Sequence, residues 1–306
     1  MSVVSKTAKS KYCYSGYSAS LMMWNLVIDN RCPVPYPEIN RKCDEKPEYQ
    51  LSSVLTMIIS VASQKGGVGK TSTAISLAAG LARKGKRVLL IDIDSQANSS
   101  KVLLPDYQKI PVDNTIFATI IHRKPLQVHK TPVPNLDIVP SHILLSNTDI
   151  ELTTALDHRE ARLKAELDLI ATNYDHVIID CPPTLSWLTI NALTASDRVV
   201  VVVSPGYFEL DSIVQISKTI KEVREIFNPN LDLMGFLFTM SDPTINTSTS
   251  LQILRQTYTD KVLKTVIPRN TDLRDAHFNQ KDVFAFNPKS KAALAYNKLI
   301  QELFEI

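Results

Sequence analysis

One stretch, residues 57–73, constrains the fold more than any other, and it reads MIISVASQKGGVGKTST. An apolar, β-branched run comes first, a glycine-rich segment follows, and an alanine- and leucine-rich helical pattern begins after Lys70. A strand, a glycine-rich turn and a helix in this order are the context of a phosphate-binding loop. The glycines let backbone N–H groups curl around phosphate oxygens, and the helix N-terminus adds positive potential. This stretch therefore predicts a site for the phosphates of a nucleotide.

Two lysines and a threonine give the loop its expected chemistry. Lys70 stands where its ammonium group can reach the outer phosphates, and the Thr71 hydroxyl can ligate Mg²⁺. Lys65 stands before the first glycine of the loop. In an isolated phosphate-binding loop this second lysine is surplus, so its presence asks for a further explanation.

Two parts of the 306-residue chain differ in character. Residues 1–56 hold three of the four cysteines and four prolines, and they show no sustained period of 3.6 or 2. We interpret them as an irregular N-terminal extension. A second hypothesis is that Met57 is the natural start of the protein. Residues 57–306 are predicted to form one large α/β domain.

Composition limits the cellular compartments in which we expect the protein. The net charge is +3, no apolar run reaches the length of a membrane-spanning helix, and the N-terminus lacks the order of a signal peptide. None of the cysteines forms a CxxC pair, which argues against a zinc site or a thiol redox motif. These features predict a cytoplasmic protein.

Apolar strands alternate with helical patterns from Met57 onward. Strands are predicted at 58–62, 88–91, 136–140, 176–180, 198–203, 231–240 and 262–267. Helices are predicted at 70–83, 158–172, 187–195, 211–227, 247–258 and 289–304, and the segment before 135 is less regular. Repeated β-then-α order with continuous apolar strands predicts a mostly parallel, twisted sheet with helices on both faces, in the manner of a P-loop NTPase.

Carboxylates follow two of these strands. In such sheets ligands bind at the carboxyl ends of the strands. Asp180 ends the strand at 176–180, where it is well placed to hold Mg²⁺ through water. Asp92 and Asp94 follow the strand at 88–91, and because they alternate, only one of them can face the outer phosphate. The sequence leaves open which one does.

Four motifs in order resemble those of the ParA/MinD family of P-loop ATPases. The segment from Lys65 to Thr71, KGGVGKT, looks like its deviant Walker A motif, and DIDSQAN at 92–98 resembles the second motif in its ParA form. IDCPP at 179–183 resembles the Walker B region, and VIPRN at 266–270 looks like the strand and loop beside the adenine. The resemblance covers residues 57–306.

The resemblance implies an ATP-dependent sandwich dimer with ATP and Mg²⁺ as cofactors. Lys65 would reach across the interface to the partner's nucleotide, as an arginine finger does, and Asp94 would position the attacking water. Thr71 and Asp180 match the Mg²⁺ site, and Lys70 matches the catalytic lysine of the loop. The implied nucleotide-binding set is Lys65, Gly66, Gly67, Val68, Gly69, Lys70, Thr71, Ser72 and Asn270.

The C-terminal third offers a basic surface for DNA. Nine basic residues stand against four acids, Asp260, Asp272, Asp275 and Asp282, between positions 255 and 298. Such a surface can neutralise phosphates without reading sequence. Asp272 departs from the family, in which a basic residue is common at that position. The candidates for DNA contact are Arg255, Arg274, Lys289 and Lys291.

The resulting functional hypothesis is an ATPase that partitions chromosomal or plasmid DNA. It would bind non-specific DNA as the ATP dimer, associate with the nucleoid, and respond to a DNA-bound partner of ParB type. The alternative is a ParA-like ATPase that positions a protein assembly. A metabolic synthetase or a metal-cluster carrier is disfavoured by the second motif, and a lone Cys181 supplies too few ligands for an iron–sulfur cluster. The C-terminal helix ends in acidic residues, so we expect it to pack on the sheet and not on a membrane.

Overall fold

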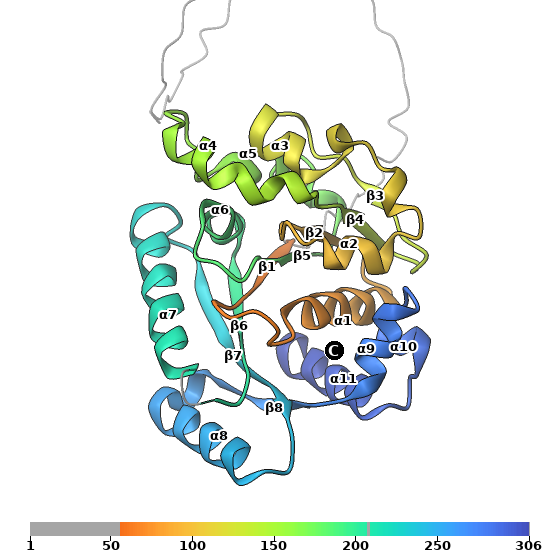
Figure 1. Ribbon diagram of the computed structural model, residues 1–306, viewed down its shortest axis with the longest axis vertical. Coiled ribbons are helices and arrows are strands. Elements are labelled where there is room, and N and C mark those ends of the chain that lie inside the picture. The colour runs from red at the N-terminus through yellow and green to blue at the C-terminus, as the bar shows by residue number, and fades with distance from the viewer. Residues whose placement is uncertain (1–55, 207–208, 306) are drawn as a thin grey trace, which may run out of the picture. The chain divides into compact units, whose positions relative to one another are not determined.

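A computed structural model describes residues 56–206 and 209–305, which contain one eight-stranded sheet. The strand order is β3-β4-β2-β5-β1-β6-β7-β8, and every neighbouring pair is parallel except β3 with β4 (Figure 1). The strands are β1 (Met57–Ala62), β2 (Val88–Asp92), β3 (His129–Lys130), β4 (Leu136–Val139), β5 (His176–Asp180), β6 (Arg198–Val203), β7 (Asp232–Ser241) and β8 (Val262–Pro268).

Helices cover both faces of this sheet. On one face lie α1 (Lys70–Arg83), α2 (Asn98–Leu103), α9 (Thr271–Phe278), α10 (Val283–Phe286) and α11 (Lys291–Phe304). On the other lie α3 (Ile116–His122), α4 (Thr148–Thr154), α5 (Arg162–Leu167), α6 (Trp187–Ala195), α7 (Glu209–Ile226) and α8 (Ile245–Tyr258). The predicted α/β architecture of a P-loop NTPase is therefore confirmed.

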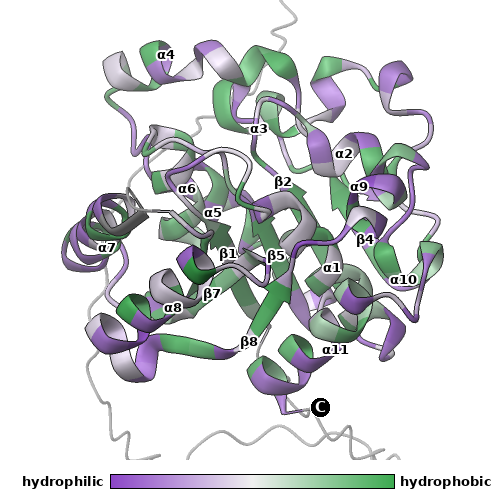
Figure 2. Cartoon of the chain, turned by 60° about the horizontal axis from the view of Figure 1, so that its bottom comes forward, coloured by the Kyte–Doolittle hydropathy of each residue, from purple (hydrophilic) through white to green (hydrophobic). Residues whose placement is uncertain are grey.

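The valine run of β6 shows why these strands are apolar throughout. Val199, Val201 and Val203 belong to the hydrophobic cluster under α6 and α7. Val200 and Val202 belong to the opposite cluster, under α1 and α11. Both strand faces are buried, so no position is left for a polar alternation. Figure 2 shows this arrangement as hydrophobic strands at the centre and a largely hydrophilic α7 at the side.

The strands and the longer helices agree with the sequence-based prediction, and the differences fall in irregular segments. The predicted helix over 158–172 is shorter, because α5 spans only Arg162–Leu167. The segment before 135 contains α2 and α3. Helix α9 was not predicted at all. The predicted N-terminal extension lies outside the described residues, apart from Thr56.

The C-terminal helix packs on the sheet side, as expected. In α11, Ala293, Tyr296 and Ile300 are buried, and the Tyr296 hydroxyl lies 3.1 Å from Thr73 Oγ1 of α1. A Cβ atom on Gly80 of α1 would come within 2.2 Å of Ile300 Cδ1, so the close approach of these helices requires glycine. Among the helices that the structure describes, none combines the length and the apolarity needed to cross a membrane.

The outer strand β8 has an irregular edge. Its pairing register with β7 shifts between Phe236 and Phe238. The backbone N–H groups of Lys264 and Thr265 donate instead to the two carboxylate oxygens of Glu302 on α11, at 2.6 and 2.8 Å. One carboxylate therefore takes up two backbone donors of this irregular outer strand.

Candidate functional site

The phosphate loop joins β1 to α1 and depends on two glycines. Gly67 and Gly69 have φ angles of 76° and 92°, in the left-handed region that other residues rarely adopt. Between them Val68 is buried, and its carbonyl accepts a hydrogen bond of 2.6 Å from Thr239 Oγ1 on β7. The loop is thus held open around its own backbone N–H groups and anchored to the neighbouring strand.

The side chain of Lys70 contacts the beginning of the loop. Its side chain is buried, and Nζ donates a hydrogen bond of 3.0 Å to the carbonyl of Lys65. Burial lowers the pKa of Lys70, although Asp180 and Asp94 act in the opposite direction. The ammonium group therefore lies in a poorly solvated position, where a phosphate oxygen is a strong partner.

Asp180, at the end of β5, has one satisfied and one unsatisfied oxygen. Oδ2 accepts a hydrogen bond of 2.7 Å from Ser99 Oγ, whereas Oδ1 is buried with no hydrogen-bond partner. Burial raises the pKa of Asp180 to about 6, and the Ser99 and Thr71 hydroxyls partly offset that rise. A buried carboxylate oxygen without a donor next to a threonine hydroxyl fits a cation that prefers oxygen ligands.

A magnesium ion in such a site needs few protein ligands. Within residues 56–206 and 209–305, no group of three or more His, Cys, Asp or Glu side chains is placed to hold a metal ion. Mg²⁺ at P-loops is usually bound through one or two side chains, with phosphates and water completing the shell. Thr71 and Asp180 meet that requirement.

The structure separates the two aspartates that follow β2. Both oxygens of Asp92 are occupied: Oδ2 accepts from Ser100 N and Oγ at 2.8 and 2.7 Å, and Oδ1 accepts from Asp94 N at 3.2 Å. Burial, with the charge of Asp180 next, holds the pKa of Asp92 well above its usual range. Asp94 lines the cavity above the loop, and its Oδ1 accepts from Gln96 N at 2.9 Å. Asp92 is thus a buried structural carboxyl group, and of the two aspartates only Asp94 lines the cavity.

A cavity of about 660 Å³ lies over the loop. The structure brings most of the predicted phosphate-site residues to it: Gly66, Gly67, Gly69, Lys70, Thr71, Ser72 and Asp94. Lys65 and Val68 are not part of its lining, and Lys65 is exposed at the start of the loop.

Asn270 is not brought to this cavity. Its Oδ1 accepts a hydrogen bond of 2.6 Å from Asp272 N, so the side chain caps the N-terminus of α9. The contact with the adenine base that the resemblance implies for Asn270 stays a prediction.

Other lining residues were missed from the sequence. Gln96, Asn98, Lys101 and Val102 come from the segment after β2, and Pro183 follows β5. Met240 comes from β7, and Arg274, His277 and Phe278 come from α9. Gln96 and Asn98 belong to the second motif, which was a signal for them, whereas no motif pointed to α9.

Three of the four candidates for DNA contact line different hollows. Arg274 lines the nucleotide cavity and pairs with Asp275 at 3.3 Å. Arg255 lines a different hollow, beside Asp242 and along α8. Lys291 lines a third hollow, between β8 and α11, and Lys289 is exposed just before that helix. The contact of Arg274 with DNA stays a prediction, and its place in the lining of the nucleotide cavity gives it a second candidate role.

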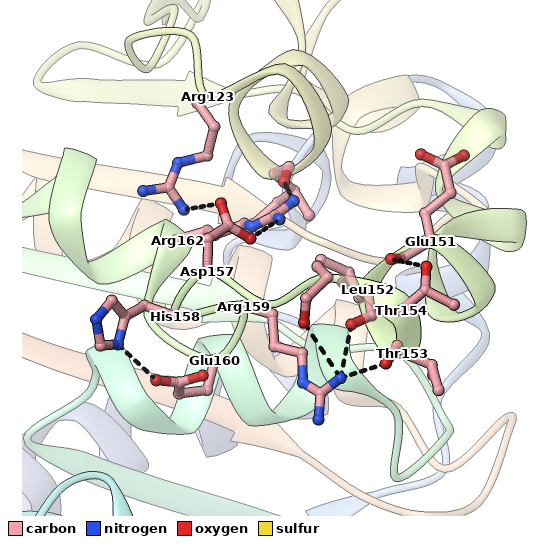
Figure 3. A network of polar contacts seen from close by, with 12 residues as sticks. Arg123, Glu151, Leu152, Thr153, Thr154, Asp157, His158, Arg159, Glu160 and Arg162 are labelled. Carbon is pink, nitrogen blue, oxygen red and sulfur yellow. Dashed lines mark hydrogen bonds and ion pairs between the residues drawn. The ribbon is translucent and has the colours of Figure 1, made fainter.

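A polar network steadies the segment that follows Asp180. Trp187 opens α6, where its backbone N–H donates to Asp149 Oδ1 and its Nε1 to Thr153 Oγ1 on α4, at 3.0 and 3.2 Å. The guanidinium of Arg159 lies 4.1 Å from the Trp187 ring centroid and donates to the carbonyls that end α4 (Figure 3). The loop from Asp180 to α6 is thus fixed at its far end.

Cys181 lies beside the carboxylate site as a buried thiol. It has no exposed surface, and burial raises the pKa of the thiol to about 12. The thiol stays protonated at neutral pH, in agreement with the prediction of a small buried residue.

Comparison with known proteins assigns the family. A family model described as AAA domain matches residues 56–233. The chain is 41% identical over 249 residues to the sporulation initiation inhibitor protein Soj of Bacillus subtilis, which covers 80% of this chain and 97% of Soj. It is 36% identical over 251 residues to the chromosome partitioning protein ParA of Myxococcus xanthus, covering 81% of this chain and 88% of that protein.

A solved structure agrees with this assignment of the fold. Cobyrinic acid a,c-diamide synthase from Mycobacterium smegmatis, solved with bound ADP and magnesium, is 32% identical with a TM-score of 0.70. The match covers 81% of this chain and 93% of that one. With its phosphate loop, its strand-end carboxylates and these relatives, the chain belongs to the ParA/MinD family of P-loop ATPases.

Proposed function

We propose that this protein is a Mg²⁺- and ATP-dependent dimerising ATPase that partitions DNA. The observation that carries the proposal is the composition of the loop: a second lysine precedes the glycines, and Asp94 lines the cavity above them. Its similarity to Soj and to a chromosome partitioning ParA supports the choice of cargo. A DNA-bound partner of ParB type would stimulate hydrolysis, with the nucleoid as the site of action.

The residues divide the work as follows. Backbone N–H groups of the loop, Lys70 and Ser72 bind the phosphates, with the positive end of α1 behind them. Asp94 accepts a hydrogen bond from the attacking water and orients it toward the outer phosphate. Lys65 extends from one subunit to the nucleotide of the other, where its charge stabilises the transferring phosphoryl group. The site is complete only when two subunits meet.

Thr71 and Asp180 would hold the magnesium ion. Bound there, Mg²⁺ supplies positive charge to the outer phosphate oxygens. Asp180 Oδ1 is the oxygen that would bind the ion or its water, because Oδ2 already accepts a hydrogen bond from Ser99. Ser99 therefore fixes the orientation of the carboxylate and leaves one oxygen for the ion or its water.

Size-exclusion chromatography tests the dimer. An Asp94→Ala variant should bind ATP without hydrolysing it and should elute as a dimer with ATP and as a monomer without it. Lys65→Ala should bind ATP, remain monomeric and hydrolyse none. A monomer in all conditions for Asp94→Ala, or hydrolysis near the unsubstituted rate for Lys65→Ala, would refute the sandwich mechanism.

DNA binding is proposed to use the lysines at the C-terminal helix. Lys264, Lys291 and Lys298 line one hollow of about 580 Å³, and Lys289 precedes it in the chain. A Lys289→Glu, Lys291→Glu double variant should lose ATP-dependent retention of non-specific DNA and should show a shallower salt dependence. Lys84→Glu, Lys86→Glu, at the far end of α1, is a control with the same change of charge. Absence of ATP-dependent DNA retention by the unsubstituted protein would favour a protein cargo instead.

A further inference from the structure

Phe278 is an aromatic side chain left in solvent at the nucleotide cavity. It lies at the end of α9, is 89% exposed and belongs to the cavity lining. Phe227 at the end of α7, by comparison, is 36% exposed and lines none of the hollows described above. Exposing a phenyl ring to water forfeits the free energy of burying it, so a ring placed at a binding cavity is suited to cover a ligand.

Helix α9 presents this ring on a fixed face. Arg274, His277 and Phe278 are spaced i, i+3 and i+4, so they share one side of the helix. Leu273 and Ala276 of the same helix are buried, and Leu273 belongs to the hydrophobic cluster that also contains α1.

Hydrogen bonds hold both ends of α9. Asn270 caps its N-terminus, and the Asn279 side chain donates to the carbonyl of Asp275 at 2.7 Å. Just beyond, Gln280 Nε2 donates to the carbonyl of Lys101 on α2 at 3.0 Å, which ties the end of α9 to the other side of the cavity. The ring is therefore held over the cavity by a structured support.

The cavity is lined by both polar and apolar side chains. The loop glycines, Lys70, Thr71 and Asp94 provide the charges and donors that phosphates and a cation need. The rest of the lining mixes apolar with polar side chains: Val102, Pro183, Met240, Phe278, Gln96, Asn98, Lys101, Arg274 and His277. A flat group with an aromatic face and a polar edge, attached to phosphates, suits such a lining, and a nucleobase is such a group.

We propose that Phe278 stacks on the purine base of the bound nucleotide and so supports its nucleoside half. The inference rests on the proposed ATP-binding function of the same cavity. Stacking needs only the face of the ring, so Tyr or Trp can replace Phe at this position, whereas Ala cannot. Inorganic tripolyphosphate carries the phosphates without a base, and Phe278 does not affect its binding.

Isothermal titration with two probes tests the proposal. ATP and inorganic tripolyphosphate, each with Mg²⁺, are titrated into the unsubstituted protein, Phe278→Ala, Phe278→Trp and the control Phe227→Ala. Phe278→Ala should weaken ATP binding about tenfold or more and leave tripolyphosphate binding unchanged. Phe278→Trp should keep the ATP affinity, and ATP but not tripolyphosphate should quench the new indole fluorescence.

The outcomes separate this inference from the function on which it rests. If the unsubstituted protein binds no ATP, the proposed function fails. If it binds ATP and Phe278→Ala binds equally well, the stacking inference is overturned. Equal weakening of both probes, with an unchanged melting temperature, would also overturn it, because the ring would then act on the cavity as a whole. An effect confined to ATP-dependent dimerisation would assign Phe278 to the subunit contact instead.

Discussion

The two walls of the nucleotide cavity are built in different ways. The phosphate wall consists of backbone N–H groups shaped by Gly67 and Gly69, with Lys70 and Asp180 buried behind them. The wall made by α9 consists of side chains, Arg274, His277 and Phe278, standing on a short helix. The first wall depends on the path of the main chain, and the second depends on residue choice at three positions.

This difference separates what the fold fixes from what substitution can tune. A substitution in the phosphate wall either leaves a buried charge unpaired or places a larger residue in the left-handed backbone conformation that glycine adopts. Both changes cost free energy of folding. A change on α9 alters only what meets the ligand, because Leu273 and Ala276 still anchor the helix. Substitutions should therefore have large effects on the first wall and graded effects on the second.

Lys70→Ala should have the largest effect. It removes the buried ammonium group that meets the phosphates, and we expect ATP affinity to fall by about 100-fold or more, measured by titration calorimetry. Lys101→Ala is the matched control, since Lys101 lines the same cavity but is exposed, and a change of only a few-fold is expected there. Equal losses of ATP affinity in the two lysine variants would contradict the proposed difference between the walls.

Asp180→Asn should separate stability from function. Burial raises the pKa of this carboxyl, so its charged form destabilises the unliganded protein, and the amide should raise the melting temperature by an amount equivalent to about 1–3 kcal/mol. The same variant should lose the further rise that Mg²⁺ with ATP gives the unsubstituted protein. Differential scanning fluorimetry with and without Mg²⁺-ATP measures both. A variant that is less stable in both conditions would show that Asp180 has a purely structural role.

Arg274→Ala should have a modest and selective effect. Because Arg274 lines the cavity and pairs only with exposed Asp275, its loss should weaken ATP binding a few-fold. Non-specific DNA retention at saturating ATP should not change. A loss of DNA retention with intact ATP binding would instead support the prediction that Arg274 contacts DNA.

His277→Gln should have the smallest effect, visible in pH dependence. Burial lowers the pKa of His277 below 6.5, so the folded protein favours the neutral ring. The stability this contributes is complete above pH 6.5 and is lost as the pH falls through the lowered pKa. In urea unfolding between pH 7.5 and 5, the variant should lose less stability than the unsubstituted protein, by about 1 kcal/mol at most. Parallel pH profiles would contradict a buried neutral ring.

The same contrast explains what the sequence could predict. The phosphate wall is built from a strand, a glycine-rich loop and a helix that are consecutive in the chain. A sequence motif could therefore predict its residues one by one. The choice between Asp92 and Asp94 depends on Ser100, eight residues beyond Asp92, whose amide and hydroxyl both occupy the Asp92 carboxylate. The alternation of side chains along a strand gives no information about that contact.

The α9 wall could not be predicted because its signals are weak or had another interpretation. In α9 only Leu273 and Ala276 are buried, too few apolar residues for a helical period. Asn270 resembled a base contact, although its side chain starts the helix. Arg274 was predicted to contact DNA, and no sequence pattern indicated that it also lines the nucleotide cavity.

The hydrogen bonds of Glu302 to the edge strand β8 affect how copies of the chain can associate. An outer strand with unpaired N–H groups recruits strands from other molecules and leads to open-ended aggregates. At Lys264 and Thr265 a carboxylate from α11 already holds those donors, and its negative charge repels an incoming carbonyl. This edge is thereby closed to an added strand at Lys264 and Thr265. Glu302 thus acts against strand-to-strand aggregation of the folded chain.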